Sequence, residues 1–305
     1  MSNLKVNFCG IEFTNPLVLP SGIIQEIPDH KRAIDAGVGA VTLKTLTPLA
    51  REGNPIPRVA RYDHGFLNSV GFRNPGIEKG ALLVRDFLKK SPVPVIVSLF
   101  AYDNDGYRMM AQKIAELKPP LIEVDISCPN VTAEFGDPVG KNKKRAAEVT
   151  SIVKSETGNI PVIVKLAADA IGVTEIAHAC EGAGADAICA TNTIGLGMLI
   201  DIKTRKPMLG NKFGGVSGPG IKPLAVKCIW DIYNAVDIPI IGTGGVATWQ
   251  DVIEMMMVGA TLVGIGSATY FKGMGIYEEV KKGLSEYMKR EEIKNLKELV
   301  GVAHD

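Results

Sequence analysis

Short apolar runs rich in valine and isoleucine recur along the whole chain, separated by longer amphipathic stretches. Each run is nearly continuous in hydrophobicity, which is typical of strands that are buried on both faces. The runs are LVLPSG (17–22), AVTLKT (40–45), VPVIVSLF (93–100), LIEVDISC (121–128), IPVIVKLA (160–167), ADAICATN (185–192), IPIIGTGG (238–245) and TLVGIGSA (261–268). Between runs, residues 142–155, 173–183 and 249–258 repeat apolar positions at helical spacing.

This alternation of strand and helix predicts a (β/α)8 TIM barrel, with a doubly wound open sheet as the alternative. No linker or low-complexity tract divides the chain, so we expect one domain over residues 1–305. Residues 5–16 read as a β-hairpin that turns near Cys9–Gly10 and closes the bottom of the barrel. Residues 48–75 and 195–223 form connections too long for plain turns, and long loops on a barrel usually carry function.

The composition of the chain argues against several classes of protein. Hydrophobic residues make up 46% of the chain and the formal net charge is +1, so no basic excess points to nucleic acid. The apolar runs are too short to span a bilayer, and the N-terminus has no signal-peptide pattern. Five cysteines without CxxC spacing argue against a disulfide framework and against an iron–sulfur cluster held by this chain. We expect a cytoplasmic protein.

Polar residues follow the predicted strands at their carboxyl ends, where barrel enzymes place their chemistry. One such residue alone could be a solvated strand end, but lysine is rarely buried without a partner and two lysines directly follow apolar runs. The strand-end residues are Ser21, Lys44, Thr45, Ser98, Asp125, Ser127, Cys128, Lys165, Asn192, Thr193, Gly244, Gly245, Gly266 and Ser267.

Glycine clusters at the last two strands predict a phosphate site. GTGGV (242–246) precedes a helix expected near Thr248, and GIGSA (264–268) ends the eighth strand. Glycine lets backbone N–H groups approach a phosphate closely, and barrels often bind phosphate at these two strands. GGVSG (214–218) is a possible third contact. A single phosphate site suits FMN better than a dinucleotide.

Lys165 then has two possible roles. A cation at a strand end stabilises the negative charge of a reduced flavin. The alternative is the Schiff-base lysine of an aldolase or lyase, which also lies at a barrel strand end.

Several motifs resemble class 1 dihydroorotate dehydrogenase, from about Gly10 to Phe271. The motifs are TLKTLTP (42–48), LNSVGFRNPG (67–76), DISCPNV (125–131), NTIG (192–195) and GGVSGPGIKP (214–223). The last of them is more similar to the B-type. The resemblance implies a homodimer whose FMN barrel works with a partner subunit carrying FAD and an iron–sulfur cluster and passing electrons to NAD.

The resemblance also implies residue roles. Cys128 would take a proton from C5 of dihydroorotate while C6 gives a hydride to the flavin, and Lys44 would lie between flavin and substrate. A thiol is a useful base when a nearby lysine lowers its pKa, although a lone cysteine can also be a small buried hydrophobe. The substrate ligands would be Asn68, Ser69, Val70, Gly71, Phe72, Asp125, Asn130, Asn192 and Thr193. FMN would be held by Ser21, Lys44, Thr45, Ser98, Asp125, Lys165, Thr191, Gly218, Gly244, Gly245, Gly266 and Ser267.

Two positions depart from the family pattern, which usually has asparagine in place of Asp125 and of Ser98. An ionised Asp125 only accepts hydrogen bonds, so it suits a ring N–H better than a carbonyl. This favours, as an alternative, a related flavin enzyme for another dihydropyrimidine such as dihydrouracil. A non-redox lyase using Lys165 and a binding subunit without activity are further alternatives.

Overall fold

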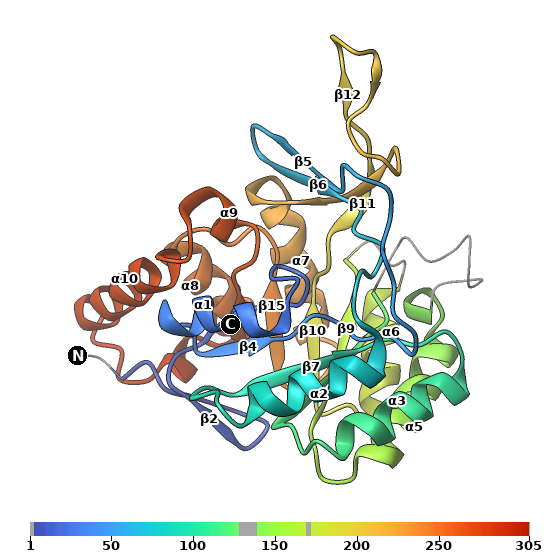
Figure 1. The fold of residues 1–305 in the computed structure, drawn as a ribbon. Coiled ribbons are helices and arrows are strands. Elements are labelled where there is room, and N and C mark those ends of the chain that lie inside the picture. Colours follow the sequence, from blue (N-terminus) through green and yellow to red (C-terminus); the bar gives the residue numbers. More distant parts are fainter. Residues whose placement is uncertain (1–2, 128–138, 169–171, 305) are drawn as a thin grey trace.

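The computed structural model describes residues 3–127, 139–168 and 172–304. Eight parallel strands close into a barrel in the order β10-β15-β16-β3-β4-β7-β8-β9. Figure 1 shows several of these strands with helices around them. Their bounds are β3 Leu17–Leu19, β4 Ala40–Thr42, β7 Val95–Leu99, β8 Leu121–Asp125, β9 Val162–Leu166, β10 Ala187–Ala190, β15 Ile240–Thr243 and β16 Ala260–Gly264. The predicted TIM barrel is confirmed, and the open-sheet alternative is wrong.

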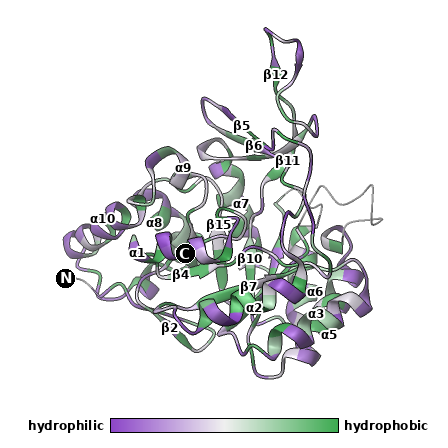
Figure 2. Ribbon diagram, viewed as in Figure 1, coloured by the Kyte–Doolittle hydropathy of each residue, from purple (hydrophilic) through white to green (hydrophobic). Residues whose placement is uncertain are grey.

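Helices surround the barrel and bury their apolar faces against its outer side (Figure 2). They are α1 Lys31–Asp35, α2 Gly76–Leu88, α3 Asn104–Ala115, α5 Lys143–Thr157, α6 Val173–Gly182, α7 Lys222–Tyr233, α8 Trp249–Met257, α9 Ala268–Lys272 and α10 Ile276–Arg290. The predicted helices match α5, α6 and α8 to within one or two residues. Short 3-10 turns are η1 Ile27–His30, η3 Val139–Lys141, η4 Pro219–Ile221, η5 Leu296–Leu299 and η6 Val302–His304. Within the described ranges, no helix is long and apolar enough to cross a membrane.

The N-terminal hairpin, β1 Val6–Phe8 and β2 Ile11–Phe13, is confirmed, with Cys9 and Gly10 at its turn. Phe8 and Phe13 are both buried and meet edge to face at 6.0 Å between ring centroids. They form one apolar cluster with residues near the amino ends of the barrel strands, including Leu121 and Ile163. The hairpin therefore closes the lower end of the barrel, as predicted.

The two long connections contain strands that pair with each other. β5 Val59–Tyr62 and β6 Gly65–Asn68 come from the first, and β11 Ile194–Gly197 and β14 Gly214–Ser217 from the second. They form an antiparallel sheet in the order β11-β14-β6-β5. A further small hairpin, β12 Ile200–Asp201 and β13 Lys206–Pro207, projects beyond this sheet in Figure 1. We call residues 54–70 and 194–217 the arm.

The carboxyl ends of the barrel strands and the arm face each other across one cavity. The barrel contributes residues that follow β3, β4, β10, β15 and β16, and the arm contributes Val59, Phe66, Asn68 and Ser217. The pairing of β14 with β6 fixes this position, because Gly215 opposes Asn68 and Val216 opposes Leu67. The fold thus sets two distant segments of the chain over the mouth of the barrel.

Candidate functional site

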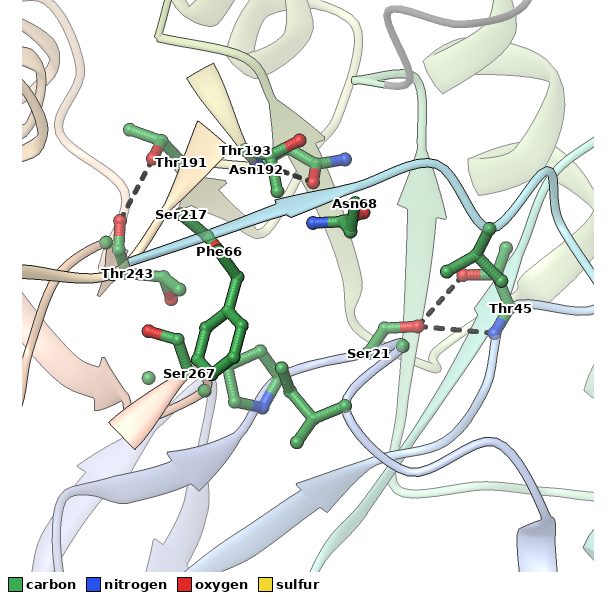
Figure 3. A pocket seen from close by; sticks show the side chains of 18 of the residues that line it. Ser21, Thr45, Phe66, Asn68, Thr191, Asn192, Thr193, Ser217, Thr243 and Ser267 are labelled. Carbon is green, nitrogen blue, oxygen red and sulfur yellow. Dashed lines mark hydrogen bonds between the residues drawn. The ribbon is translucent and has the colours of Figure 1, made fainter. Parts of the chain in front are cut away.

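A cavity of about 220 Å³ lies at the mouth of the barrel, under the arm. Most of the predicted site residues line it, and Figure 3 shows several of them around one space. Those lining it are Ser21, Lys44, Thr45, Asn68, Val70, Gly71, Phe72, Asp125, Lys165, Thr191, Asn192, Thr193, Gly218, Gly244, Gly245, Gly266 and Ser267.

Two of the predicted residues that the structure describes, Ser69 and Ser98, do not line the cavity. Cys128 and Asn130 lie outside the described residues. Ser69 is buried behind the wall, where its hydroxyl accepts hydrogen bonds from the Asn54 amide at 2.8 Å and the Asn211 amide at 3.0 Å. Ser98 lies in the barrel interior and bonds to the Thr45 hydroxyl at 3.0 Å. Ser69 and Ser98 therefore stand one layer behind the wall that they were predicted to form.

One side of the cavity carries a chain of polar side chains from three segments. The Asn192 amide donates to the Ser127 hydroxyl at 2.8 Å, and that hydroxyl donates to Asp125 Oδ1 at 2.6 Å. The Ser127 backbone N–H donates to the same oxygen at 3.1 Å. One Asp125 oxygen is thereby engaged by Ser127, and hydrogen-bond geometry holds both Asp125 and Asn192 in place at the cavity wall.

Asn68 and Thr193 belong to the same region, although they come from different long connections. Gly215 pairs with Asn68 across the sheet, and a Cβ on Gly215 would lie 2.0 Å from the Thr193 hydroxyl. Because only glycine leaves that space, Thr193 can sit close under β14. The Thr193 backbone N–H donates to the Asn192 side chain at 2.7 Å, which fixes both residues (Figure 3).

Two lysines bring positive charge to the cavity. Lys44 and Lys165 are each 5% exposed. The Lys44 ammonium lies 5.7 Å from the centroid of the Phe72 ring, within cation–π range, and Phe72 stacks on Phe100 at 4.5 Å. Lys165 lies in β9, in register with Asp125 of β8 and Cys189 of β10. Both charges are thus fixed on rigid strand ends.

The glycine turns after β15 and β16 line the opposite part of the cavity. Gly244 and Gly245 have φ of +134° and +75°, a region that side chains rarely adopt. A Cβ on Gly245 would also lie 2.8 Å from the backbone nitrogen of Lys222. α8 begins just beyond, with the Thr248–Asp251 capping box at its N-terminus. The donor set of glycine backbone, Ser267 hydroxyl and helix end fits a phosphate group.

Several lining residues escaped the sequence prediction. Phe66 of the arm and Tyr270 of α9 meet edge to face at 5.6 Å, and the Tyr270 hydroxyl donates to the Ile23 carbonyl at 2.7 Å. Both rings line the cavity next to the glycine turns. Glu123, a fully buried carboxyl beneath the cavity, was missed as well. Its signal was in the run LIEVDISC, where every second residue from Glu123 onward is polar.

Fold and site together define a barrel enzyme. One end of its cavity is lined by glycine turns that fit a phosphate group, and the other end is lined by amide and charged side chains. The family profile "Dihydroorotate dehydrogenase" matches residues 3–288, so the chain belongs to this family of oxidoreductases of pyrimidine biosynthesis.

Relatives along the full length agree with this assignment. A protein from Methanocaldococcus jannaschii is 40% identical over 99% of this chain and 98% of its own. One from Pyrococcus abyssi is 38% identical over 98% of this chain and 99% of its own, and one from Desulforamulus reducens is 39% identical over 99% of both. All three carry the name dihydroorotate dehydrogenase B (NAD(+)), catalytic subunit.

Proposed function

We propose that this protein oxidises dihydroorotate to orotate with FMN as hydride acceptor and Cys128 as base. The single observation that carries the proposal is one cavity that combines two buried lysines, a set of amides and two glycine turns, in a chain of this family. Enzymes of the family are flavoproteins, and the single glycine-lined phosphate site supports the mononucleotide. When bound, FMN would accept the hydride from C6 of the substrate.

Residues of the chain would bind the substrate and remove its C5 proton. Asn68, Asn192 and Thr193 would hold the carbonyl and N–H groups of the ring and its carboxylate, because an amide both donates and accepts. Asp125, with one oxygen engaged by Ser127, would accept from a ring N–H through the other. Lys44 would neutralise the substrate carboxylate. Cys128 would take the C5 proton from the ring face opposite the cofactor, since base and hydride acceptor must lie on opposite faces.

Lys165 and the glycine turns would hold the cofactor. A lysine charge beside the flavin stabilises its reduced, negatively charged form. Ser21, Thr45, Thr191, Gly218, Gly244, Gly245, Gly266 and Ser267 line the same cavity and would complete the FMN site. The Schiff-base alternative for Lys165 finds no support in the family.

We further propose a homodimer that works with an FAD and iron–sulfur subunit. The three relatives are named catalytic subunits, which implies a partner for them. The arm exposes apolar side chains, such as Ile56 at 79% and Ile202 at 86%, and such surfaces mark interfaces. The described cysteines are free, which supports a reducing compartment such as the cytoplasm. We also keep the expectation of one domain over residues 1–305.

The deciding experiment is anaerobic reduction of the purified yellow protein, first by dihydroorotate and then by dihydrouracil. We expect dihydroorotate to bleach the flavin and dihydrouracil to do so far more slowly. The reverse order would support the alternative dihydropyrimidine, for which Asp125 is the favouring residue. A protein that releases no FMN on denaturation, by mass spectrometry, would contradict the proposal.

A further inference from the structure

Two aromatic rings line the cavity, and the proposed reaction gives them no role. Phe66 of β6 and Tyr270 of α9 meet edge to face, with 5.6 Å between their ring centroids. Phe66 is 9% exposed, whereas Tyr270 is 59% exposed. Tyr270 therefore lies at the rim of the cavity and Phe66 lies deeper. We call these two residues the aromatic pair.

The aromatic pair adjoins the part of the cavity that fits a phosphate group. Tyr270 follows Ser267 by three residues, and its backbone N–H donates to the Ser267 carbonyl at 3.0 Å. Phe66 opposes Ser217 where β6 pairs with β14, and Gly218 follows directly. Figure 3 draws Phe66, Ser217 and Ser267 around this part of the cavity. The two rings thus come from segments that touch both the turn after β16 and the turn at Gly218.

Contacts with neighbouring residues hold the aromatic pair in place. Phe271 also packs on Phe66, with 4.6 Å between ring centroids. The Arg61 guanidinium lies 5.1 Å from the centroid of the Phe271 ring, within cation–π range. The Tyr270 hydroxyl donates to the Ile23 carbonyl at 2.7 Å. Neither ring of the pair can turn aside without losing one of these contacts.

The space beyond the phosphate decides which class of flavin a site accepts. FMN ends at its phosphate, whereas FAD continues through the same phosphate to a second phosphate, a ribose and an adenine. Backbone N–H groups on glycine turns can bind the first phosphate of either molecule. Discrimination therefore requires an element that clashes with the longer molecule.

We propose that the aromatic pair closes the space beyond the phosphate and thereby restricts the cavity to a mononucleotide. Phe66 and Tyr270 are then specificity-determining residues. The adenylate half of a dinucleotide would have to displace Tyr270, which lies at the rim. This inference rests on the proposed flavin function and narrows it to one class of flavin.

The Tyr270 hydroxyl offers a competing explanation, in which the residue only supports the phosphate turn. A Cβ on Gly266 would lie 2.9 Å from Ile23 Cδ1, so Ile23 packs directly on the turn after β16. The bond from Tyr270 to Ile23 would then stabilise that turn for both flavins alike. A role of the ring in specificity and a role of the hydroxyl in support predict different results for different substitutions.

Isothermal titration of the flavin-free full chain with FMN and with FAD separates the two explanations. The readout is the Kd for FAD divided by the Kd for FMN. In wild type we expect FAD to bind at least about tenfold more weakly, because extra groups forced into a packed site are costly. Tyr270→Ala should remove most of this difference, mainly through tighter binding of FAD. Tyr270→Phe keeps the ring and should keep the wild-type ratio, even if both affinities fall.

Two further variants test the position of the effect. Phe66→Leu removes the deeper ring, keeps an apolar side chain in the core and should lower the ratio in the same direction. Tyr287→Ala is the matched control, because Tyr287 of α10 packs on Trp249 at 5.7 Å and does not line the cavity. Its ratio should equal that of wild type. Circular dichroism of each variant checks that the barrel is folded.

The outcomes distinguish this proposal from the proposed function. A wild-type chain that binds FMN and FAD equally would overturn the role of the aromatic pair alone. A Tyr270→Ala ratio equal to that of wild type would do the same, and equal losses of both flavins in Tyr270→Ala and Tyr270→Phe would assign the residue to support of the turn. A folded chain that binds neither flavin would instead defeat the proposed function, and this proposal with it.

Discussion

The barrel interior is buried at both ends, but its side chains are apolar at the lower end, next to the hairpin, and charged at the upper end, next to the cavity. At the lower end, Phe8 and Phe13 pack on aliphatic side chains from the barrel strands. At the upper end, Lys44, Asp125 and Lys165 are each 5% exposed around the cavity. Burial alone therefore does not distinguish core from site. The lower layer stabilises the fold through apolar contact, whereas burial of the charges in the upper layer costs stability, which the proposed function explains.

Single strands carry both kinds of layer. β8 contributes Leu121 to the apolar cluster, Glu123 to the buried polar layer and Asp125 to the cavity wall. β9 repeats this change from Ile163 to Lys165. The role of a residue thus depends on how far along the strand it lies. Substitutions at the two ends should therefore separate catalysis from stability.

The largest effect is expected for Cys128→Ala, which removes the proposed base. Loss of a positioned base should slow flavin reduction by dihydroorotate by roughly 10²–10⁴-fold without loss of flavin. Cys128→Ser should keep part of the rate and shift its optimum to higher pH, because a hydroxyl ionises less readily than a thiol. Stopped-flow absorbance measures both.

A cysteine at the lower end provides the control. Cys9 lies at the hairpin turn, where burial raises its pKa to about 12. Cys9→Ala should reduce flavin at the parental rate. A parental rate in Cys128→Ala would leave that residue without the role of base.

Substitutions at the lower end should lower the free energy of unfolding and leave flavin binding unchanged. Phe13→Ala removes a fully buried ring and should lower the free energy of unfolding by about 3–5 kcal/mol. Flavin affinity of the folded protein should not change. Phe13→Leu keeps most of the volume and should cost under about 1.5 kcal/mol. Urea unfolding followed by circular dichroism measures the loss, and weaker flavin binding at full stability would contradict the separation of the two ends.

The same contrast explains how much of the molecule could be predicted from sequence. The barrel strands were predictable because residues such as Val162 and Val164 face helices while Ile163 faces the interior, so the run is apolar throughout. The positions of Lys44 and Lys165 at strand ends were predictable as well, because each lysine directly follows an apolar run. Helix α5 was predictable from its spacing, and its cap residue Asn142 accepts from the Lys144 and Arg145 N–H groups.

The arm and the buried carboxyl could not be predicted in the same way. β6 and β14 lie far apart in the chain, and their pairing depends on register and on Gly215 leaving room for Thr193. No local pattern encodes such a match. The alternation of Glu123, Asp125 and Ser127 indicates that Glu123 faces the same side as Asp125, but its neighbours, such as Ser98 of β7, come from other strands and cannot be read from the local sequence.

An intermediate effect is expected at the glycine turn after β15. Gly245→Ala places a side chain at φ +75° and within 2.8 Å of the Lys222 backbone. The displaced turn should bind FMN about tenfold more weakly, the loss expected for one charge-assisted hydrogen bond. Isothermal titration of the flavin-free protein measures the affinity. Gly158→Ala, at φ +58° with open space at the end of α5, should leave the affinity unchanged. Equal losses in both variants would show backbone strain alone.

The smallest effect is expected at Asp251, which ties the same turn to α8. Its carboxylate accepts from the Ala247 and Thr248 N–H groups at 2.9 Å and from the Lys222 ammonium at 2.7 Å. Burial alone would raise the pKa of Asp251, but these hydrogen bonds and the Lys222 charge hold it below its usual value. Because the folded pKa is depressed, the stabilisation is present above the unfolded pKa of about 3.9 and is lost as pH falls through the folded pKa.

Asp251→Asn should therefore lower the free energy of unfolding by about 1 kcal/mol at neutral pH, the usual value of a helix cap. The difference from wild type should begin to shrink below about pH 4 and should be lost as pH falls through the depressed pKa of folded Asp251, because below that pKa both proteins carry a neutral side chain. Asp231→Asn is the control, because Asp231 pairs with Lys227 on the surface of α7 and should change stability by a few tenths of a kcal/mol. If the Asp251→Asn difference persisted unchanged in acid, the carboxylate charge would not be its source. The amide's loss of shape complementarity at the cap would then explain it.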